Sequence, residues 1–376
     1  QEESMGKEYD FFKDKGLHNE SIDLGFNHKS GLFVNGGYTR NNHGGWQGDL
    51  TGREKRWHPK DQALMNGMFG FQNRNMNVWY RLDFLDEKIF GPNNGSELQP
   101  EKVSDKDFLT KRYTHQLQSD WKLDNRLDVH AALSYQDYKR RTRTTESDLS
   151  TGEKWLSSAE ASQDITQYKA WIARATVAWN IAPEFSVQPG VEYQWTQGEG
   201  GRIDGTPKVS DLAFFLSAEY KPWEWLSLRP GVRTFIVADY DAPIAIPSVL
   251  TKFKLTKHMD LRLSYAYGFR SPTLQELYFS FHNDNHDIDG NPDLKAEYSH
   301  NITGSVAYRV LHSEKIHLTT TLSGFYNDFR DKISLAQNVD IPNYNTYYNI
   351  DRYKTVGGSL ENSLSWGGLR ANLNVS

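Results

Sequence analysis

Apolar and polar residues alternate with a period of two in segment after segment of this chain. In residues 127–135 the odd positions are Leu, Val, Ala, Leu and Tyr, while the even positions are Asp, His, Ala and Ser. Residues 171–179 repeat the pattern with Trp at both ends, over about the nine residues that a tilted strand needs to cross a hydrocarbon layer. Further candidate strands are 76–84, 185–195, 226–235 and 261–269. The alternation predicts an all-β protein.

The connections between these segments alternate between short and long. The short turns are 29–31, 73–75, 124–125, 180–184, 222–224, 256–258, 311–314 and 367–368. The long stretches are 41–61, 86–107, 140–164, 196–210, 238–247, 270–297 and 334–344. One rim of short turns and one of long loops is typical of bacterial outer-membrane barrels, and eight short turns predict roughly sixteen strands.

The composition permits a membrane barrel although the mean hydropathy, -0.72, resembles that of a soluble protein. The chain has no run of about eighteen apolar residues, so a membrane-spanning helix is excluded and any membrane role must use strands. Aromatic residues make up 13% of the chain, which suits girdles at two membrane interfaces, although a soluble β-sandwich can be equally aromatic. We therefore expect one domain over 1–376, a transmembrane antiparallel β-barrel with long extracellular loops.

Other features exclude several functions. The chain has no cysteine, which removes disulfides and thiolate metal sites, and its net charge of -5 argues against a nucleic-acid partner. It has neither a Gly-x-Ser-x-Gly elbow, nor a His-Glu-x-x-His helix, nor a phosphate-binding glycine loop. We therefore do not expect an enzyme. No apolar signal segment opens the sequence, so we expect the chain to start after processing or to be a fragment.

Two short motifs flank a polar stretch in the second half of the chain. The motif Phe-Arg-Ser-Pro at 269–272 and the motif Asn-Pro-Asp-Leu at 291–294 resemble the FRAP and NPDL boxes of TonB-dependent outer-membrane receptors, which import heme, siderophores and cobalamin. The resemblance continues through 325–333 and 348–357. The residues of the two boxes are Phe269, Arg270, Ser271, Pro272, Asn291, Pro292, Asp293 and Leu294.

The resemblance implies a fold, a location and partners. Receptors of this family are roughly 22-stranded barrels around a plug domain in the bacterial outer membrane. The chain resembles an internal portion of such a barrel, with the plug domain and the last strands absent. The implied partners are the TonB–ExbB–ExbD energising complex acting through that plug, outer-membrane lipid or lipopolysaccharide, and a surface lipoprotein. A passive porin or scaffold barrel is the alternative.

The boxes have a structural and a ligand-binding interpretation. Pro272 and Pro292 each remove a backbone donor and fix φ, so they mark points where strand pairing stops. With Phe269, Arg270 and Asn291 they are expected to shape the transition from strand to loop, with the Asn291 side chain bonding local backbone. The alternative is direct contact with a ligand, in which Arg270 would take part.

The stretch between the boxes carries the candidate cargo site. Imidazole is a common axial ligand of heme iron, and the resemblance implies a histidine between the two boxes of heme receptors, where His282 and His286 fall. Tyr278 and Phe281 would flank the porphyrin. The sequence thus favours heme as the transported ligand, with no intrinsic cofactor and no bound metal. A ferric siderophore or cobalamin would use the aromatic and arginine residues without an axial histidine.

Weaker signals lie elsewhere. Residues 285–290 match part of a calcium loop, but the closing Glu would fall at Ala296 and Pro292 interrupts the pattern. The basic run 139–143 suits an anionic ligand or lipopolysaccharide phosphates, although a solvated loop base is the plainer interpretation. The segment 223–225, Trp-Glu-Trp, is typical of an interfacial anchor.

Overall fold

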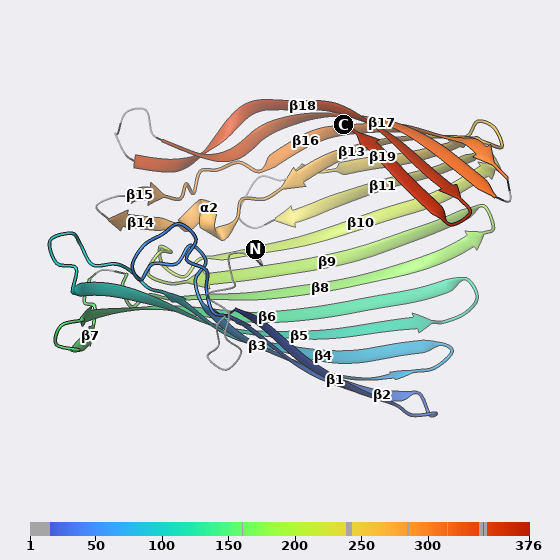
Figure 1. Cartoon of the computed structure of the whole chain (residues 1–376). Helices are drawn as coiled ribbons and strands as arrows, with labels where there is room; N and C mark the ends of the chain where they lie inside the picture. Colours follow the sequence, from blue (N-terminus) through green and yellow to red (C-terminus); the bar gives the residue numbers. More distant parts are fainter. Residues whose placement is uncertain are drawn as a thin grey trace. The chain divides into compact units, whose positions relative to one another are not determined.

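The computed structural model describes residues 16–159, 161–237, 243–283, 286–313, 315–337, 341 and 344–376. Nearly every described element is a β-strand (Figure 1). The chain divides into two units, one made of 1–121, 131–173 and 194–208 and the other of 122–130, 174–193 and 209–376. The strands β6, β8 and β9 contribute residues to both units.

The first unit is built on an antiparallel ladder of consecutive strands. Its turns are tight: the Asn73 carboxamide oxygen accepts hydrogen bonds from the backbone N–H groups of Asn75 and Met76, both at 2.8 Å, and this local bonding ends one strand and starts the next. The elements are β1 (Leu17–Asn27), β2 (Leu32–His43), β3 (Lys60–Gln72), β4 (Met76–Gly91), β5 (Lys102–Lys122), β6 (Leu127–Asp148), β7 (Lys154–Leu156), β8 (Ile165–Ala182) and β9 (Phe185–Glu199). Registers join β1 through β5 in chain order.

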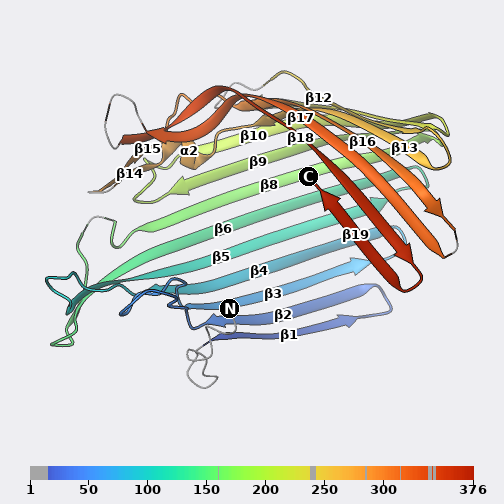
Figure 2. The same cartoon turned by 45° about the horizontal axis from the view of Figure 1, so that its top comes forward.

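The second unit continues the same design and holds the two sequence motifs. Its long strands pair antiparallel in the order β10–β11–β12–β13–β16–β17–β18–β19 and run side by side in both views (Figure 1, Figure 2). The elements are β10 (Lys208–Trp223), β11 (Leu226–Val237), β12 (Ile246–Lys254), β13 (Met259–Arg270), α2 (Leu274–Tyr278), β14 (Ser280–Asn283), β15 (His286–Asp289), β16 (Glu297–His312), β17 (Ile316–Gln337), β18 (Tyr344–Trp366) and β19 (Leu369–Val375). Within the described residues of this unit, α2, β14 and β15 lie between β13 and β16, which pair directly with each other.

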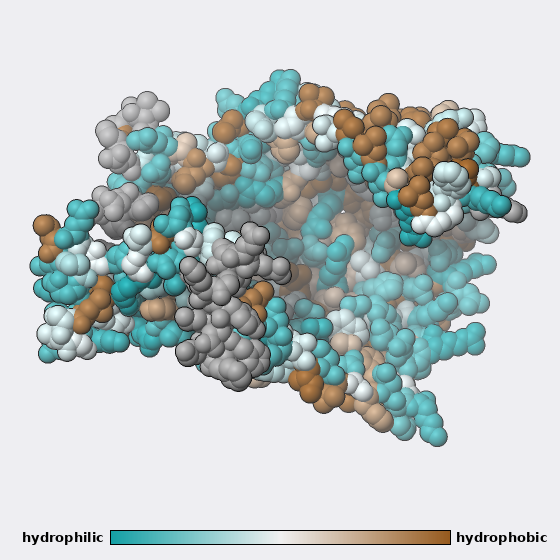
Figure 3. Space-filling view, viewed as in Figure 1, coloured by the Kyte–Doolittle hydropathy of each residue, from teal (hydrophilic) through white to brown (hydrophobic). Residues whose placement is uncertain are grey.

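The two faces of this second ladder differ in polarity. One face, here called the outer face, carries a cross-strand row of apolar residues: Leu261, Val306, Leu322, Leu360 and Val375. Leu322, Leu360 and Val375 are exposed, with 59% of Leu322 open, and Leu261 and Val306 are half-buried. Apolar side chains also gather over β17–β19 in Figure 3. The inner face lines a concavity of about 1160 Å³, in which Leu250 and Phe325 lie among mostly polar residues: Arg262, Ser264, Thr303, Ser305, Ser323 and Ser359. An exposed apolar face opposite a polar one is the pattern of a barrel wall in lipid.

The predicted all-β architecture and its turns are confirmed. The described part of the chain has nineteen strands, of which β7, β14 and β15 have only three or four residues, and this leaves sixteen long ones. Each of the eight predicted short turns falls where one long strand ends and the next begins. Among the described residues, none of the helical structure is long and apolar enough to cross a bilayer.

Several stretches predicted as long loops are partly strand. β4 runs to Gly91 and β5 starts at Lys102, so much of 86–107 is paired, and β6 carries the stretch 140–148. Beyond the lipid a hairpin still satisfies its backbone N–H and C=O groups by pairing, but it no longer needs an apolar face. The alternation in hydropathy therefore stops before the strand does.

Candidate functional site

The candidate site is the connection between β13 and β16, which contains both motifs. It begins with the short helix α2, whose N-cap is Thr273. The Thr273 hydroxyl accepts a hydrogen bond from the Glu276 backbone N–H at 3.2 Å, and the Glu276 carboxylate accepts one from the Thr273 backbone N–H at 2.7 Å. This capping box satisfies donors that a helix start leaves without partners. It also aims the Glu276 carboxylate back towards the end of β13.

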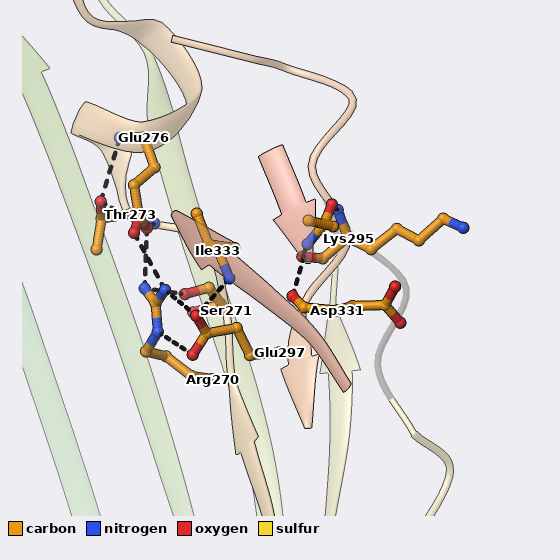
Figure 4. A network of polar contacts seen from close by, with 9 residues as sticks. Arg270, Ser271, Thr273, Glu276, Lys295, Glu297, Asp331 and Ile333 are labelled. Atoms are coloured by element: carbon orange, nitrogen blue, oxygen red, sulfur yellow. Dashed lines mark hydrogen bonds and ion pairs between the residues drawn. The ribbon is translucent and has the colours of Figure 1, made fainter. Parts of the chain in front are cut away.

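Arg270, the last residue of β13, bridges two carboxylates (Figure 4). Its guanidinium donates to Glu297 from Nε at 2.9 Å and from Nη2 at 2.8 Å, and to Glu276 from Nη1 at 2.8 Å and from Nη2 at 3.0 Å. A longer bond at 3.4 Å joins Nη1 to the Ser271 carbonyl. Five hydrogen bonds match the five donors of a guanidinium, so Arg270 is saturated within the protein. We call Arg270, Glu276 and Glu297 the clamp.

The clamp also holds the next hairpin. The Glu297 carboxylate accepts a hydrogen bond from the Ile333 backbone N–H of β17 at 2.6 Å. Beside it, the Asn349 side chain of β18 accepts from the Lys295 N–H at 2.8 Å and donates to the Lys295 carbonyl at 2.9 Å and the Asp331 carbonyl at 2.7 Å. Asp331 has a φ of 49°, so β17 is locally irregular where these bonds form. Side chains here replace ladder bonds between β16, β17 and β18.

A small apolar cluster lies beneath the helix. Leu277 of α2, Leu294 of the second motif and Ile333 of β17 are buried together, and Val209, Tyr278 and Tyr347 pack against them. Pro272 of the first motif is fully buried. Burial of this apolar surface favours the folded form of the connection. The two motifs are thus parts of one packed structure.

Gly290 allows the chain to pass close to the helix. A Cβ at this position would lie 2.6 Å from the Leu277 carbonyl carbon and 2.7 Å from the Tyr278 nitrogen, both backbone atoms. The Gly290 N–H donates to the Phe279 carbonyl at 2.6 Å, and the Asn291 N–H donates to the Glu276 carbonyl at 2.8 Å. A side chain at 290 would therefore separate the second motif from α2.

Asn291 ties the second motif to β18. Its carboxamide oxygen accepts from the Asp293 N–H at 2.9 Å, which forms a local turn, and its amide donates to the Tyr347 carbonyl at 2.9 Å. Pro292 and Asp293 are exposed, whereas Leu294 is buried. Phe269 has its ring 5.0 Å from that of Phe235 on β11.

Between the motifs the chain forms the hairpin β14–β15. Its register pairs His282 with Asp287 and Asn283 with His286. β15 also pairs parallel with the start of β18, where Asp289 lies opposite Thr346. The side chains of His282 and His286 lie outside the described part of the structure. The backbone nevertheless places both predicted ligands on one hairpin, next to the wall strand β18.

The aromatic candidates lie at the base of this hairpin. Tyr278 packs against the apolar cluster and is half-buried. Phe281 is half-buried too, with its ring 6.4 Å from that of Phe279. Three of the five predicted ligand residues, Arg270, Tyr278 and Phe281, are therefore engaged with neighbouring protein groups in this structure.

The electrostatics of the clamp favour its ionised form. Burial raises the pKa of the Glu276 carboxyl, but hydrogen bonds from Arg270 and Thr273 and the guanidinium charge outweigh it, so the pKa of Glu276 lies below its usual value. Only 16% of each of the Glu276 and Glu297 side chains is exposed, against 41% for Arg270. The carboxylates are thus shielded while the cation reaches the surface.

The remaining sequence candidates have other surroundings. Residues 139–143 are in β6, where Arg140 lies over the Phe108 ring at 4.7 Å and Arg143 pairs with Asp107. Trp223 and Trp225 stack with ring centroids 5.1 Å apart at an exposed turn. In the stretch matched to a calcium loop, Asn285 lies outside the described residues and Asp289 accepts from the Tyr344 hydroxyl at 3.1 Å. No group of three or more metal-ligating side chains occurs within the described ranges.

Sequence reasoning missed the partners that complete the clamp. Glu297 and Asn349 bond residues far away along the chain, which no local pattern shows, whereas Glu276 bonds Arg270 only six residues away. One signal was present: Thr273-x-x-Glu276 has the spacing of a capping box and predicts the helix start.

Comparisons with known proteins agree on the family. The family model described as TonB dependent receptor-like, beta-barrel matches residues 188–376, half of the chain. A segment of 82 residues is 38% identical to hemoglobin and hemoglobin-haptoglobin-binding protein C of Haemophilus influenzae, which covers 22% of this chain and 7% of that protein. A segment of 118 residues is 31% identical to hemoglobin-binding protein A of the same organism, covering 28% and 11%. The matches span about a tenth or less of these relatives.

Solved structures share the fold. The siderophore receptor PirA from Pseudomonas aeruginosa has a TM-score of 0.69 at 13% identity, over 95% of this chain and 67% of that one. A double mutant of the Serratia marcescens hemophore receptor HasR, in complex with its hemophore HasA and heme, has a TM-score of 0.68 at 14% identity, over 96% and 63%. At these identities the likeness is one of fold.

Proposed function

Because the chain belongs to the TonB dependent receptor-like β-barrel family, we propose that it is part of an outer-membrane receptor that imports an iron complex, with heme as the cargo. The observation that carries the choice of cargo is the hairpin β14–β15, which holds His282 and His286 within five residues on a base fixed by the clamp. Imidazole is a common axial ligand of heme iron. The names of the curated relatives, which are hemoglobin-binding proteins, support the same cargo.

The clamp has a definite part in this proposal. Arg270 has no donor left for a ligand, so its role is to fix where the hairpin leaves β13 and where the chain re-enters β16. The parallel pairing of β15 with β18 fixes the far side of the hairpin. A ligand loop held at two places binds with less loss of conformational freedom than a free loop. The structure around the histidines therefore favours a preorganised binding loop.

Transport requires more than this wall. In the proposed receptor, cargo bound at the long loops is released inward when the TonB–ExbB–ExbD complex acts through a plug domain. The polar inner face, with Arg262, Ser264 and Thr303 along it, is the surface past which the cargo would travel. A surface lipoprotein would deliver cargo to the long loops.

An uptake experiment tests this function. A bacterial strain that depends on heme as its iron source is complemented with the full-length receptor, with its His282→Ala, His286→Ala variant, or with a control variant, His312→Ala, His317→Ala. The control removes a histidine pair at the short-turn rim, whose Nδ1 atoms are 3.0 Å apart. We expect growth with the wild type and control but not with the hairpin variant. Equal growth of all three on heme, or growth of the wild type on a ferric siderophore but not on heme, would overturn the choice of cargo.

A further inference from the structure

The short turn between β16 and β17 carries two histidines directly opposite each other. The register pairs His312, the last residue of β16, with His317 near the start of β17. Inside this pair, the Ser313 N–H donates to the Ile316 carbonyl at 2.9 Å. Hydrogen-bonded and non-hydrogen-bonded pairs alternate along an antiparallel ladder, and side chains lie closer in the second kind. The histidines occupy the pair next to the bonded one, so the turn sets their side chains close together.

The two imidazole rings face each other through the same kind of atom. The Nδ1 atoms of His312 and His317 are 3.0 Å apart, and the ring centroids are 4.8 Å apart with the planes at 53°. A neutral imidazole has one N–H and one acceptor nitrogen, so a single proton is shared between these two nitrogens. Both residues are exposed, and an ion can therefore reach the two nitrogens from water.

The distance between the two nitrogens fits one metal ion held by both. Metal–imidazole bonds are about 2.0–2.1 Å long. Two such bonds at a right angle set their nitrogens about 2.9 Å apart, whereas a tetrahedral angle sets them about 3.3 Å apart. The observed 3.0 Å is closer to the right-angle value. Square-planar geometry with nitrogen ligands is typical of Cu²⁺ and Ni²⁺, and Cu²⁺ binds such sites more tightly.

We propose that His312 and His317 form a site for a divalent transition-metal ion, with Cu²⁺ as the preferred one. The two Nδ1 atoms are neighbouring ligands, and water fills the other positions, since no group of three metal-ligating side chains occurs in the described part of the chain. The shared proton moves to Nε2 of the ring that carries it. The pair therefore binds as two neutral imidazoles, without a change of oxidation state and without net release of a proton.

The bound ion would join the turn end of the hairpin β16–β17. At the other end the same hairpin is held by the bond from the Ile333 N–H to Glu297. Alternation along β17 places His317 on the same face as Ser323, which lines the polar concavity. The ion would therefore lie on the polar face of the wall. The inference rests on this hairpin and not on the proposed cargo.

The experiment measures copper binding to the full-length receptor, purified without a polyhistidine tag and freed of metal with a chelator. Isothermal titration with Cu²⁺ gives the number and affinity of bound ions, and electron paramagnetic resonance shows how many nitrogens coordinate them. The test variants are His312→Ala and His317→Ala, each alone. The matched control is His28→Ala, His258→Ala, which removes two exposed imidazoles from separate short turns.

The expected result follows from the loss of a second bond to the same ion. Either test variant should bind Cu²⁺ at this site about 100-fold more weakly, whereas the control should bind it like the wild type. The difference between the wild-type and variant resonance spectra should show two nitrogen ligands. Wild-type affinity in either test variant, equal loss in the control, or a difference spectrum with one nitrogen would overturn the proposal. Heme titration of both test variants should match the wild type, so failure of the copper site and failure of the heme proposal are distinguishable.

Discussion

Arg270 and Glu297 are the last register partners of β13 and β16, and their side chains meet in two hydrogen bonds of 2.9 and 2.8 Å. The pair closes the entire connection that carries both motifs and the hairpin β14–β15. Glu276 joins the same guanidinium from inside the connection. The first motif supplies the cation, Arg270. Of the two carboxylates that accept its hydrogen bonds, Glu276 follows the first motif and Glu297 follows the second. This explains physically why the two motifs occur together.

Replacing Arg270 by Lys should open the connection while leaving the strands paired. An ammonium cannot make two bidentate contacts, so buried carboxylate oxygens lose partners at a cost of about 1–3 kcal/mol. Hydrogen exchange of residues 271–283 and 286–296 should speed up correspondingly. Arg74→Lys, in an exposed turn between β3 and β4, is the control and should change nothing. Unchanged exchange in Arg270→Lys would contradict the clamp.

The connection should loosen in acid. In the folded protein the pKa of Glu276 lies below its usual value of about 4.3. The ionised carboxylate therefore stabilises the fold fully above about pH 4.3, and this stabilisation is lost as the pH falls through the lowered pKa of the folded state. Limited proteolysis between β13 and β16 should therefore increase below about pH 4. In the Glu276→Gln variant, the protease should cleave this connection faster at neutral pH, and the cleavage rate should depend less on pH. An increase in cleavage on raising the pH would have the wrong sign.

Gly290→Ala should be disruptive although alanine is small. Its Cβ would meet backbone atoms of Leu277 and Tyr278 at 2.6–2.7 Å, and backbone cannot move aside as a flexible side chain can. Gly67→Ala in β3, where the Cβ has no atom within 4 Å, is the matched control. Protease sensitivity is measured while the temperature is raised. The connection should become cleavable at a lower temperature in Gly290→Ala but not in Gly67→Ala. Equal behaviour of the two variants would contradict the close approach.

Asn349→Asp tests the link between β18 and the second motif. The change keeps the shape of the side chain but turns the donor to the Lys295 and Asp331 carbonyls into an acceptor. Two carbonyls would then face a carboxylate, at a cost of about 1–3 kcal/mol. Exchange at Lys295 and Ile333 should rise, whereas Asn374→Asp on exposed β19 should leave it unchanged. Protection at Lys295 equal to the wild type would show that the contact is dispensable.

The sequence predicted the wall better than the connection. Alternation at 127–135 and the turn residues at 73–75 depend on neighbours in the chain, so they reveal strand positions and short turns. The hairpin β14–β15 pairs with β18 more than fifty residues away, and Glu297 bonds Ile333 on another hairpin. Such contacts depend on the folded register. The polar stretch between the motifs was therefore expected as a plain loop, with the helix and hairpin unforeseen.

The most direct measurement is a heme titration of the full-length receptor, followed by visible absorption. Single His282→Ala and His286→Ala variants are compared with the double variant and with the His312→Ala, His317→Ala control. A saturable Soret shift that persists in the control and is lost in the double variant is the predicted result, and the single variants then identify the ligand. A shift that is absent from the wild type, or that survives in the double variant, would contradict heme binding by this hairpin.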